Sequence, residues 1–524
     1  MKKNILISLA ASCLVLVSSC TKNFEQYNTD PNGVTNEEML RDGYALRAAL
    51  TGMASAVIST DVNTTQFTEC LLGGPMAGYL SDSNQGFRNT ISNYNPTDNW
   101  TNVLLSSSRI IPTFYSNYGD LSNMTEDPIL LSIAKVLKVA VLHRVADTYG
   151  PIPYSQIGLG GKIQVPYDSQ EQAYKNMISD LSEAIEVLSA NRAVNINPTA
   201  DIVFDGSVEK WAKFANSLKL RLALRISYAD PAAAREAAEE VARDAVGPMS
   251  SNADNATYKN FSANAKNPFY VVQVEYNGGD SMVAADIVAY MNGYSDPRRA
   301  AYFNPSEFEG FEYVGLRHGI EMPANDVMHM FSTVNISMDS PFVWMNAAEV
   351  AFLKAEAVAV FGFDMGGTAK EFYEEGIRLS FAQWGVGGAD DYISDATSKP
   401  EVYTDPTGSN SYGGSLSDIT VAWDEGATVE RKQEKIMIQK WIANWLIGNE
   451  SWADIRRTGY PHILPATDEG NKSNGLVDSQ FGARRMKYPA DEYVNNAENI
   501  RSAVEKLGGP DEMSTRTWFD CKNF

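Results

Sequence analysis

Aromatic residues in two glycine- and asparagine-rich stretches are the part of this chain best suited to bind a ligand. A flat ring stacks on the C–H face of a sugar or on a peptide side chain, and asparagine and serine side chains pair with hydroxyl and amide groups. Both stretches lack helical periodicity, so we expect these rings on loops. The predicted ligand-binding residues, with Trp100 first, are Trp100, Tyr94, Phe87, Tyr79, Tyr276, Tyr290 and Tyr294. The alternative is that half or more of these rings anchor the loops in the protein core.

Catalytic patterns are not evident in the sequence. The four histidines lack the spacing of metal-ligand pairs, and neither an HExxH motif, a G-x-S-x-G elbow nor a P-loop occurs. Asp390, Asp391 and Asp395 share one loop and leave a structural calcium ion open, but they miss the register of an EF-hand. Paired carboxylates of a glycosidase also stay open in a chain with 65 acidic residues. We predict a protein without enzyme activity and without a catalytic metal or cofactor.

The charge of the chain argues against a nucleic-acid partner. Its net charge is -22, from 43 basic and 65 acidic residues, and such a field repels phosphate backbones. Arg456 and Arg457 are therefore expected to cap carbonyl groups and pair with carboxylates instead of binding an anionic ligand.

The N-terminus carries the marks of an exported, lipid-anchored protein. Lys2 and Lys3 precede an apolar run, residues 5–17, that is too short to span a bilayer. The run ends in Val-Ser-Ser-Cys, which resembles the bacterial lipobox, so residues 1–19 are predicted to be a lipoprotein signal peptide and Cys20 to be acylated.

Two further features follow this signal. Residues 20–36 are polar and include the turn pattern Asp-Pro-Asn-Gly, so we expect a lipidated tether there. Cys70 and Cys521 stay in the mature chain, and a disulfide between them is left open.

Helical periodicity dominates the rest of the chain and supplies the elements that must carry the loops. Ile438, Trp441, Ile442 and Trp445 follow the i, i+3, i+4, i+7 spacing that places four large apolar groups on one helical face. We predict that this face is buried at the centre of a mainly α-helical core. Further helical stretches are expected at about residues 127–149, 170–191, 205–227, 230–247, 345–361, 368–384 and 495–507. Consecutive helices joined by tight turns are typical of tetratricopeptide-like hairpins, although no fixed repeat period is present.

The helical stretches are interrupted by three regions without periodicity. We predict a single domain over residues 37–524, with loop-rich insertions at about 72–102, 250–343 and 386–426. A few short strands are expected in the insertions. Tyr270–Glu275, which reads Tyr-Val-Val-Gln-Val-Glu, is predicted to be one of them.

Four blocks in this order resemble the SusD/RagB family of Bacteroidetes surface lipoproteins, in its SusD-like branch. Each block alone would be unremarkable, but the four together run from the tether to near the C-terminus. They are NTDPN at residues 28–32, KWAKFANSLKLRLALRIS at 210–227, MNAAEVAFLKAEA at 345–357, and QKWIANWLIGNESWADIRRTGYP at 439–461 followed by RRMKYPADE at 484–492.

This resemblance implies a function as well as a fold. It implies a tetratricopeptide-like helical scaffold whose loops carry the ligand site, anchored in the outer membrane and facing the cell exterior. It also implies docking as a lid on a SusC-type TonB-dependent barrel during nutrient uptake. Relatives bind oligosaccharides or peptides, and the matching blocks belong to the scaffold, so the ligand stays open. The alternative function is a surface lipoprotein hydrolase, a glycosidase or peptidase, that acts on the same nutrients.

Overall fold

The computed structural model divides the chain into two units, Met1–Ala48 and Ala49–Phe524. The residues that the structure describes are 43–106, 108–158 and 164–523. The predicted signal peptide, the predicted acylation site Cys20 and the predicted tether, residues 20–36, therefore lie outside the described residues.

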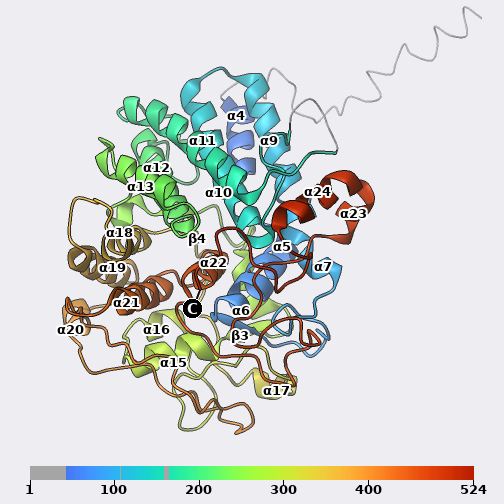
Figure 1. The fold of residues 1–524 in the computed structure, drawn as a ribbon, viewed down its shortest axis with the longest axis vertical. Helices are drawn as coiled ribbons and strands as arrows, with labels where there is room; N and C mark the ends of the chain where they lie inside the picture. The colour runs from blue at the N-terminus through green and yellow to red at the C-terminus, as the bar shows by residue number, and fades with distance from the viewer. Residues whose placement is uncertain (1–42, 107, 159–163, 524) are drawn as a thin grey trace, which may run out of the picture. The chain divides into compact units, whose positions relative to one another are not determined.

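Paired helices form the scaffold of the second unit (Figure 1). The scaffold helices are α10 Pro128–Tyr149, α11 Gln170–Ala190, α12 Val208–Arg225, α13 Pro231–Arg243, α18 Ala347–Phe361, α19 Ala369–Gln383, α21 Val429–Ala443 and α22 Gly448–Thr458. Helix α11 packs on α10, α12 packs on α11, and α13 packs on α12. Helix α18 packs on both α19 and α21. The mainly α-helical, tetratricopeptide-like fold class predicted from the sequence is confirmed.

Helix starts in the scaffold follow from capping residues. The Asp127 side chain accepts a hydrogen bond from the Ile129 amide, and Pro128 takes the first helical position, where its missing N–H costs nothing. Ser169 caps α11 through the Gln172 amide, and Ser207 caps α12 through the Lys210 amide. These short polar residues set where each helix of the scaffold begins.

Further elements precede, connect and follow the scaffold helices. In the first part of the chain they are α4 Tyr44–Ala54, α5 Val62–Thr65, the π-helix η2 Gln66–Gly73, α6 Gly74–Met76, α7 Asp98–Thr101, α8 Val103–Ser106, α9 Ile111–Met124 and η3 Pro198–Ala200. Further on they are η4 Asn252–Asp254, α14 Pro268–Tyr270, η5 Val271–Glu275, α15 Ala285–Gly293, α16 Arg299–Tyr302, α17 Asn325–Met328, α20 Ala389–Ile393, α23 Ala490–Asn495 and α24 Ala497–Leu507.

Two small antiparallel sheets join distant parts of the chain. Strand β1 Leu80–Asp82 pairs with β3 Ser281–Val283, and β2 Ala256–Tyr258 pairs with β4 Phe342–Met345. The first pair fastens the predicted first insertion to the second.

The strand predicted at Tyr270–Glu275 is wrong, because α14 and η5 cover these residues. Asn267 accepts a hydrogen bond from the Phe269 amide at 2.7 Å, and Pro268 occupies the first helical position. This N-terminal cap outweighs the strand preference of the three valines that follow.

The tryptophan-rich helices lie in the core, as predicted. Trp441, Trp445 and Trp452 are buried, and the Trp441 indole N–H donates to the Ala77 carbonyl at 2.7 Å. Arg457 binds both carboxylate oxygens of Glu356 at 2.8 Å. The prediction that this arginine pairs with a carboxylate is thus confirmed.

Arg456 and the two cysteines complete this comparison with the sequence. Arg456 donates to the carbonyl groups of Asp147 and Arg484, as expected of a carbonyl-capping residue. Cys70 is buried and Cys521 is exposed, and they are not bonded to each other.

Within the described ranges, no helix combines the length and the apolar character that crossing a bilayer requires.

Candidate functional site

Three aromatic side chains from separate segments meet at the surface of the second unit. The Trp100 ring lies 5.0 Å from that of Phe87 at an interplanar angle of 90°, and 5.3 Å from that of Phe67 at 71°. All three are partly exposed. We call Phe67, Phe87 and Trp100 the aromatic platform. Edge-to-face packing holds the rings in place while part of their surface stays open to a ligand.

The position of each platform ring is fixed by a different local structure. Trp100 lies on the single turn of α7, and Phe67 lies near the start of η2. Phe87 follows a tight turn in which the Asn84 side chain accepts from the Gly86 amide at 2.8 Å and the Asn84 carbonyl accepts from the Phe87 amide at 2.9 Å. The platform is therefore built on short, internally bonded turns.

One buried carboxylate ties these turns to a third segment. Asp280 accepts from Gln66 Nε2 at 2.6 Å, from Asn84 Nδ2 at 2.8 Å and from Asn277 Nδ2 at 2.9 Å. Gln66 precedes Phe67, and Asn277 follows Tyr276. Asp280 thus fixes the segments that carry two platform rings and the predicted residue Tyr276.

Tyr276 lies beside the platform segments and is also partly exposed. Its hydroxyl group is 3.4 Å from Asn63 Oδ1 on α5, the short helix that leads into η2. The turn after Tyr276 requires positive φ angles at Asn277, Gly278 and Gly279, which favour asparagine and glycine. Three predicted binding residues, Trp100, Phe87 and Tyr276, are thereby held on one connected set of segments.

The other four predicted binding residues lie in the core. Tyr79 and Tyr290 are fully buried and both rings pack against Trp441, at 5.5 and 5.2 Å. The Tyr290 hydroxyl group donates to the His462 carbonyl, and that of Tyr294 to the Ile419 carbonyl. Tyr94 is 6% exposed. These rings have no open face for stacking, so the expectation that they contact a ligand is corrected: they anchor the loops to the core.

Phe67 and Asp280 were missed by the sequence interpretation. Phe67 stands in a polar stretch, Asn-Thr-Thr-Gln-Phe-Thr-Glu, that was not assigned to a loop or a site. The run Asn-Gly-Gly-Asp at residues 277–280 is a strong turn signal, and it marks Asp280 as the residue that closes the turn.

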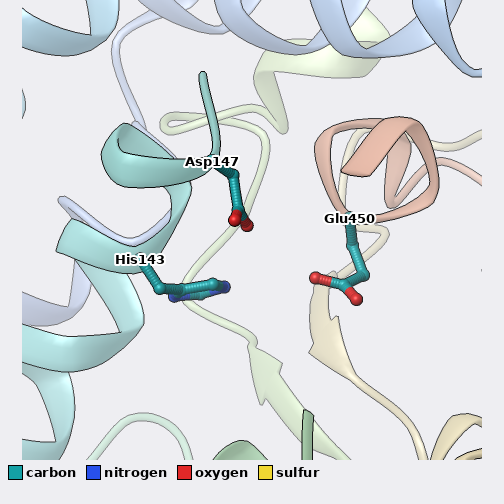
Figure 2. A group of neighbouring side chains, drawn as sticks. All are labelled: His143, Asp147 and Glu450. Carbon is teal, nitrogen blue, oxygen red and sulfur yellow. The ribbon is translucent and has the colours of Figure 1, made fainter. Parts of the chain in front are cut away.

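A second candidate site is a buried group of side chains of the types that bind metal ions. Figure 2 shows His143 and Asp147 on α10 facing Glu450 on α22, and their ligand atoms lie within 4.8 Å of one another. Arg225 approaches the same carboxylates, at 2.6 Å from Glu450 and 3.4 Å from Asp147. The adjoining cavity has a volume of about 20 Å³, enough for about one water molecule.

These distances identify an internal ionic network. Burial, together with the nearby Arg221, lowers the pKa of His143 to about 3, so its ring is neutral. Arg225 and Arg221 hold the pKa of Glu450 far below its usual value despite burial. The guanidinium groups already neutralise the carboxylates that an ion would need.

The aspartates considered for calcium do not converge. Asp390 binds Arg378 at 2.9 Å, and Asp391 is exposed. The Asp395 side chain accepts from the Thr397 and Ser398 amides, which closes its own turn. The Asp390 and Asp395 carboxylates are thus engaged in local structure.

Comparison with known proteins adds independent information. A family model described as SusD-like, Susd and RagB outer membrane lipoprotein, matches residues 26–520. No curated protein matches the chain. A SusD homolog from Bacteroides uniformis is 54% identical, with a TM-score of 0.89 over 91% of this chain and 100% of that one.

Two other solved structures are informative. A SusD homolog from Bacteroides ovatus is 38% identical, with a TM-score of 0.85 over 92% of this chain and 100% of that one. A chitin-binding SusD homolog from Flavobacterium johnsoniae is 35% identical, with a TM-score of 0.84 over 91% of this chain and 99% of that one.

Proposed function

Because this chain belongs to the SusD-like family of outer membrane lipoproteins, we propose that it is a lipid-anchored, surface-exposed protein that captures oligomeric nutrients. In this proposal it acts as the lid of a SusC-type TonB-dependent transporter and hands the captured oligomer to the barrel. The family places it at the outer membrane. The anchor at Cys20 and the outward orientation are part of the proposal.

The aromatic platform is the observation that carries this proposal. Its rings are partly exposed yet held by edge-to-face packing and by the Asp280 network, so little conformational entropy is lost when a ligand stacks on them. Flat rings beside amide groups suit sugar rings, which offer C–H faces and hydroxyl groups. A relative of known structure is described as chitin-binding, which favours an oligosaccharide over a peptide.

The chain is a binding protein and not an enzyme, as its family relationship indicates. This sets aside the surface hydrolase that the sequence left as an alternative. Retention of a saccharide without any cleavage product would agree with this assignment.

The test compares binding by the wild type and by Trp100→Ala. Purified protein without the lipid anchor is titrated with chito-, cello- and malto-oligosaccharides and with a neutral peptide, and products are analysed by mass spectrometry. Loss of one stacked ring costs about 1–2 kcal/mol, so the dissociation constant should rise about five- to thirtyfold. The far-ultraviolet circular dichroism should stay unchanged, because Trp100 lies outside the paired helices.

Trp423→Ala is the matched control, since Trp423 is also partly exposed but lies far along the chain, between α20 and α21. It should bind like the wild type. Equal affinity of Trp100→Ala and the wild type for every ligand that binds would reject the platform as the binding site.

The transporter part of the proposal has a separate test. Cross-linking in intact cells, followed by affinity purification from solubilised outer membranes, should recover a TonB-dependent barrel together with the wild type. Recovery of the protein alone would reject its function as a lid.

A further inference from the structure

A groove lined by amide side chains lies in the second unit. It has a volume of about 560 Å³, within the range of sites that enclose a small ligand. The ends of α19 and α21 and both strands of the β2–β4 sheet line it. None of the three platform rings is among its described lining residues. Its amide-bearing lining residues are Asn252, Asn255, Asn267, Asn335, Asn346 and Gln383. We call this cavity the amide groove.

Most of these amides hold the walls in place. Asn346 caps α18 through the Glu349 amide at 2.7 Å, and Asn267 accepts from the Phe269 amide and donates to the Ser340 carbonyl. Asn255 accepts from the Ala347 amide at 2.8 Å and donates to Gln383. The walls are therefore fixed before any ligand arrives, which lowers the entropic cost of binding.

Two buried polar atoms in the lining have no partner within the described residues. One is the donor Trp384 Nε1 and the other is the acceptor Asn252 Oδ1. Unpaired buried polar atoms are rare in folded proteins because each carries a desolvation cost. Each of these atoms has almost no accessible surface, so a ligand in the groove would contact the partly exposed Trp384 ring and Asn252 side chain around them.

Aromatic rings and a strained turn complete the groove. Trp384 packs edge-on against Tyr302 at 4.7 Å, and Tyr302 stacks on Trp445, another lining residue, at 5.4 Å. Leu446, also in the lining, has a φ of 65°. A leucine rarely adopts this left-handed conformation, and such residues are concentrated at functional sites.

The charge of the lining limits the class of ligand. Lys259 is the only charged residue among the described residues of the lining, and it faces Asp205 at 3.6 Å. Flexible peptides commonly bring charged side chains or termini, for which this lining offers no acidic partner. A neutral sugar brings hydroxyl or acetamido groups and apolar ring faces, which match amides and aromatic rings.

We propose that the amide groove is a second saccharide-binding site, which takes a neutral sugar unit against the partly exposed Trp384 ring and the amide side chains of the lining. The ligand class rests on the saccharide capture proposed above. The groove extends that function, because a second site on another group of elements would let one chain hold a long or branched oligosaccharide at two points.

Fluorine NMR can observe both sites in one experiment. The nine tryptophans are replaced by 5-fluorotryptophan, and the signals are assigned by single Trp→Phe substitutions. The probes are chitohexaose, cellohexaose, maltohexaose and a neutral hexapeptide with blocked ends. At least one saccharide should shift the Trp384 signal, and it should do so in Trp100→Ala as well.

Ala253→Phe tests whether the ligand occupies the groove itself. Ala253 is an exposed lining residue, so a phenyl group there should occupy part of the groove and weaken the Trp384 response at least tenfold. Ala232→Phe, at an exposed position on α13, is the matched control and should leave the response unchanged. Trp384→Ala removes the partly exposed ring, so affinity in the Trp100→Ala background should fall about five- to thirtyfold by calorimetry.

The outcomes separate the two sites. A shift of the Trp100 signal without any shift of Trp384 would overturn the groove proposal and leave the platform intact. A Trp384 shift with the peptide alone would overturn the saccharide assignment. Unchanged signals from both tryptophans with every probe would reject both proposed sites.

Discussion

At the scale of single residues, the buried carboxyl group of Asp82 illustrates how burial controls charge. Asp82 on β1 is 3% exposed and accepts a hydrogen bond from Ser92. Burial raises its pKa to about 7, although Ser92 and the nearby His318 act in the opposite direction. The folded protein therefore binds this proton more tightly than the unfolded chain does.

We expect Asp82→Asn to change the pH dependence of stability. Because the pKa of Asp82 is raised in the folded state, this group stabilises the wild type at low pH. This contribution to the free energy of unfolding, up to about 4 kcal/mol, is lost as the pH rises from about 4 through about 7. The asparagine variant lacks this titration. Urea unfolding at pH 5 and pH 8 should show a smaller fall in the free energy of unfolding for the variant.

Asp326→Asn serves as the control, because Asp326 is exposed on α17. It should reproduce the wild-type difference between the two pH values. An Asp82→Asn variant that loses as much stability as the wild type over this range would contradict the assignment.

At this scale the sequence did not distinguish rings that stay partly exposed from rings that pack on the core. Trp100, Phe87 and Tyr276 were predicted from composition, and they are partly exposed. Tyr79 and Tyr290 were predicted on the same grounds but cover Trp441. Which loop ring packs on a buried helix depends on contacts across more than 150 residues, which local patterns do not contain.

At the scale of elements, two glycines let the π-helix that carries Phe67 dock on the tryptophan-rich helices. Gly73 ends η2 and Gly448 begins α22. A Cβ atom on Gly448 would lie 2.4 Å from the carbonyl carbon of Gly73, a distance that real Cβ atoms do not adopt. The close approach of these two backbones requires glycine.

We expect Gly448→Ala to push η2 away from α22. The new methyl group meets backbone atoms that cannot rotate aside, so the variant should lose about 1–3 kcal/mol of unfolding free energy. Because η2 carries Phe67, saccharide affinity at the platform should fall as well. Chemical denaturation and titration with the oligosaccharide that the wild type binds would measure the two effects.

Gly119→Ala is the matched control. Gly119 lies in α9 with nothing within 4 Å of an added Cβ atom, and alanine favours a helix by about 0.5–1 kcal/mol over glycine. This variant should be as stable as the wild type or more so, with unchanged binding. A Gly448→Ala variant with the same stability and affinity as Gly119→Ala would show that the close approach is not required.

Element-scale prediction was strongest where capping and periodicity agree. The helices that follow Asp127-Pro128 and Asp230-Pro231 begin where the sequence indicates. The strand prediction at residues 270–275 was wrong because the run of valines favours a strand, while the preceding Asn267-Pro268 starts a helix. The π-helices were not foreseen, since an extra residue per turn depends on tertiary packing.

At the scale of the whole molecule, charge and lipid anchoring must be considered together. A chain with a net charge of -22 is repelled by anionic lipid headgroups, so electrostatic attraction cannot hold it at a membrane. Residence at the outer membrane, which the family implies, then needs either a covalent lipid or a protein partner.

We propose that Cys20 provides the lipid anchor, and its substitution tests this. Each buried acyl CH₂ group contributes about 0.8 kcal/mol, so several acyl chains together hold a protein firmly, and Cys20→Ala should lose them all. Expressed in a Bacteroidetes host and separated by ultracentrifugation after a high-salt wash, the variant should move from the membrane pellet to the soluble fraction. Cys521→Ala, which removes an exposed thiol in the body of the protein, should stay in the pellet. Retention of Cys20→Ala in the washed membranes would contradict the anchor. A labelled fatty acid should be incorporated into Cys521→Ala but not into Cys20→Ala, which would identify the acylated residue directly.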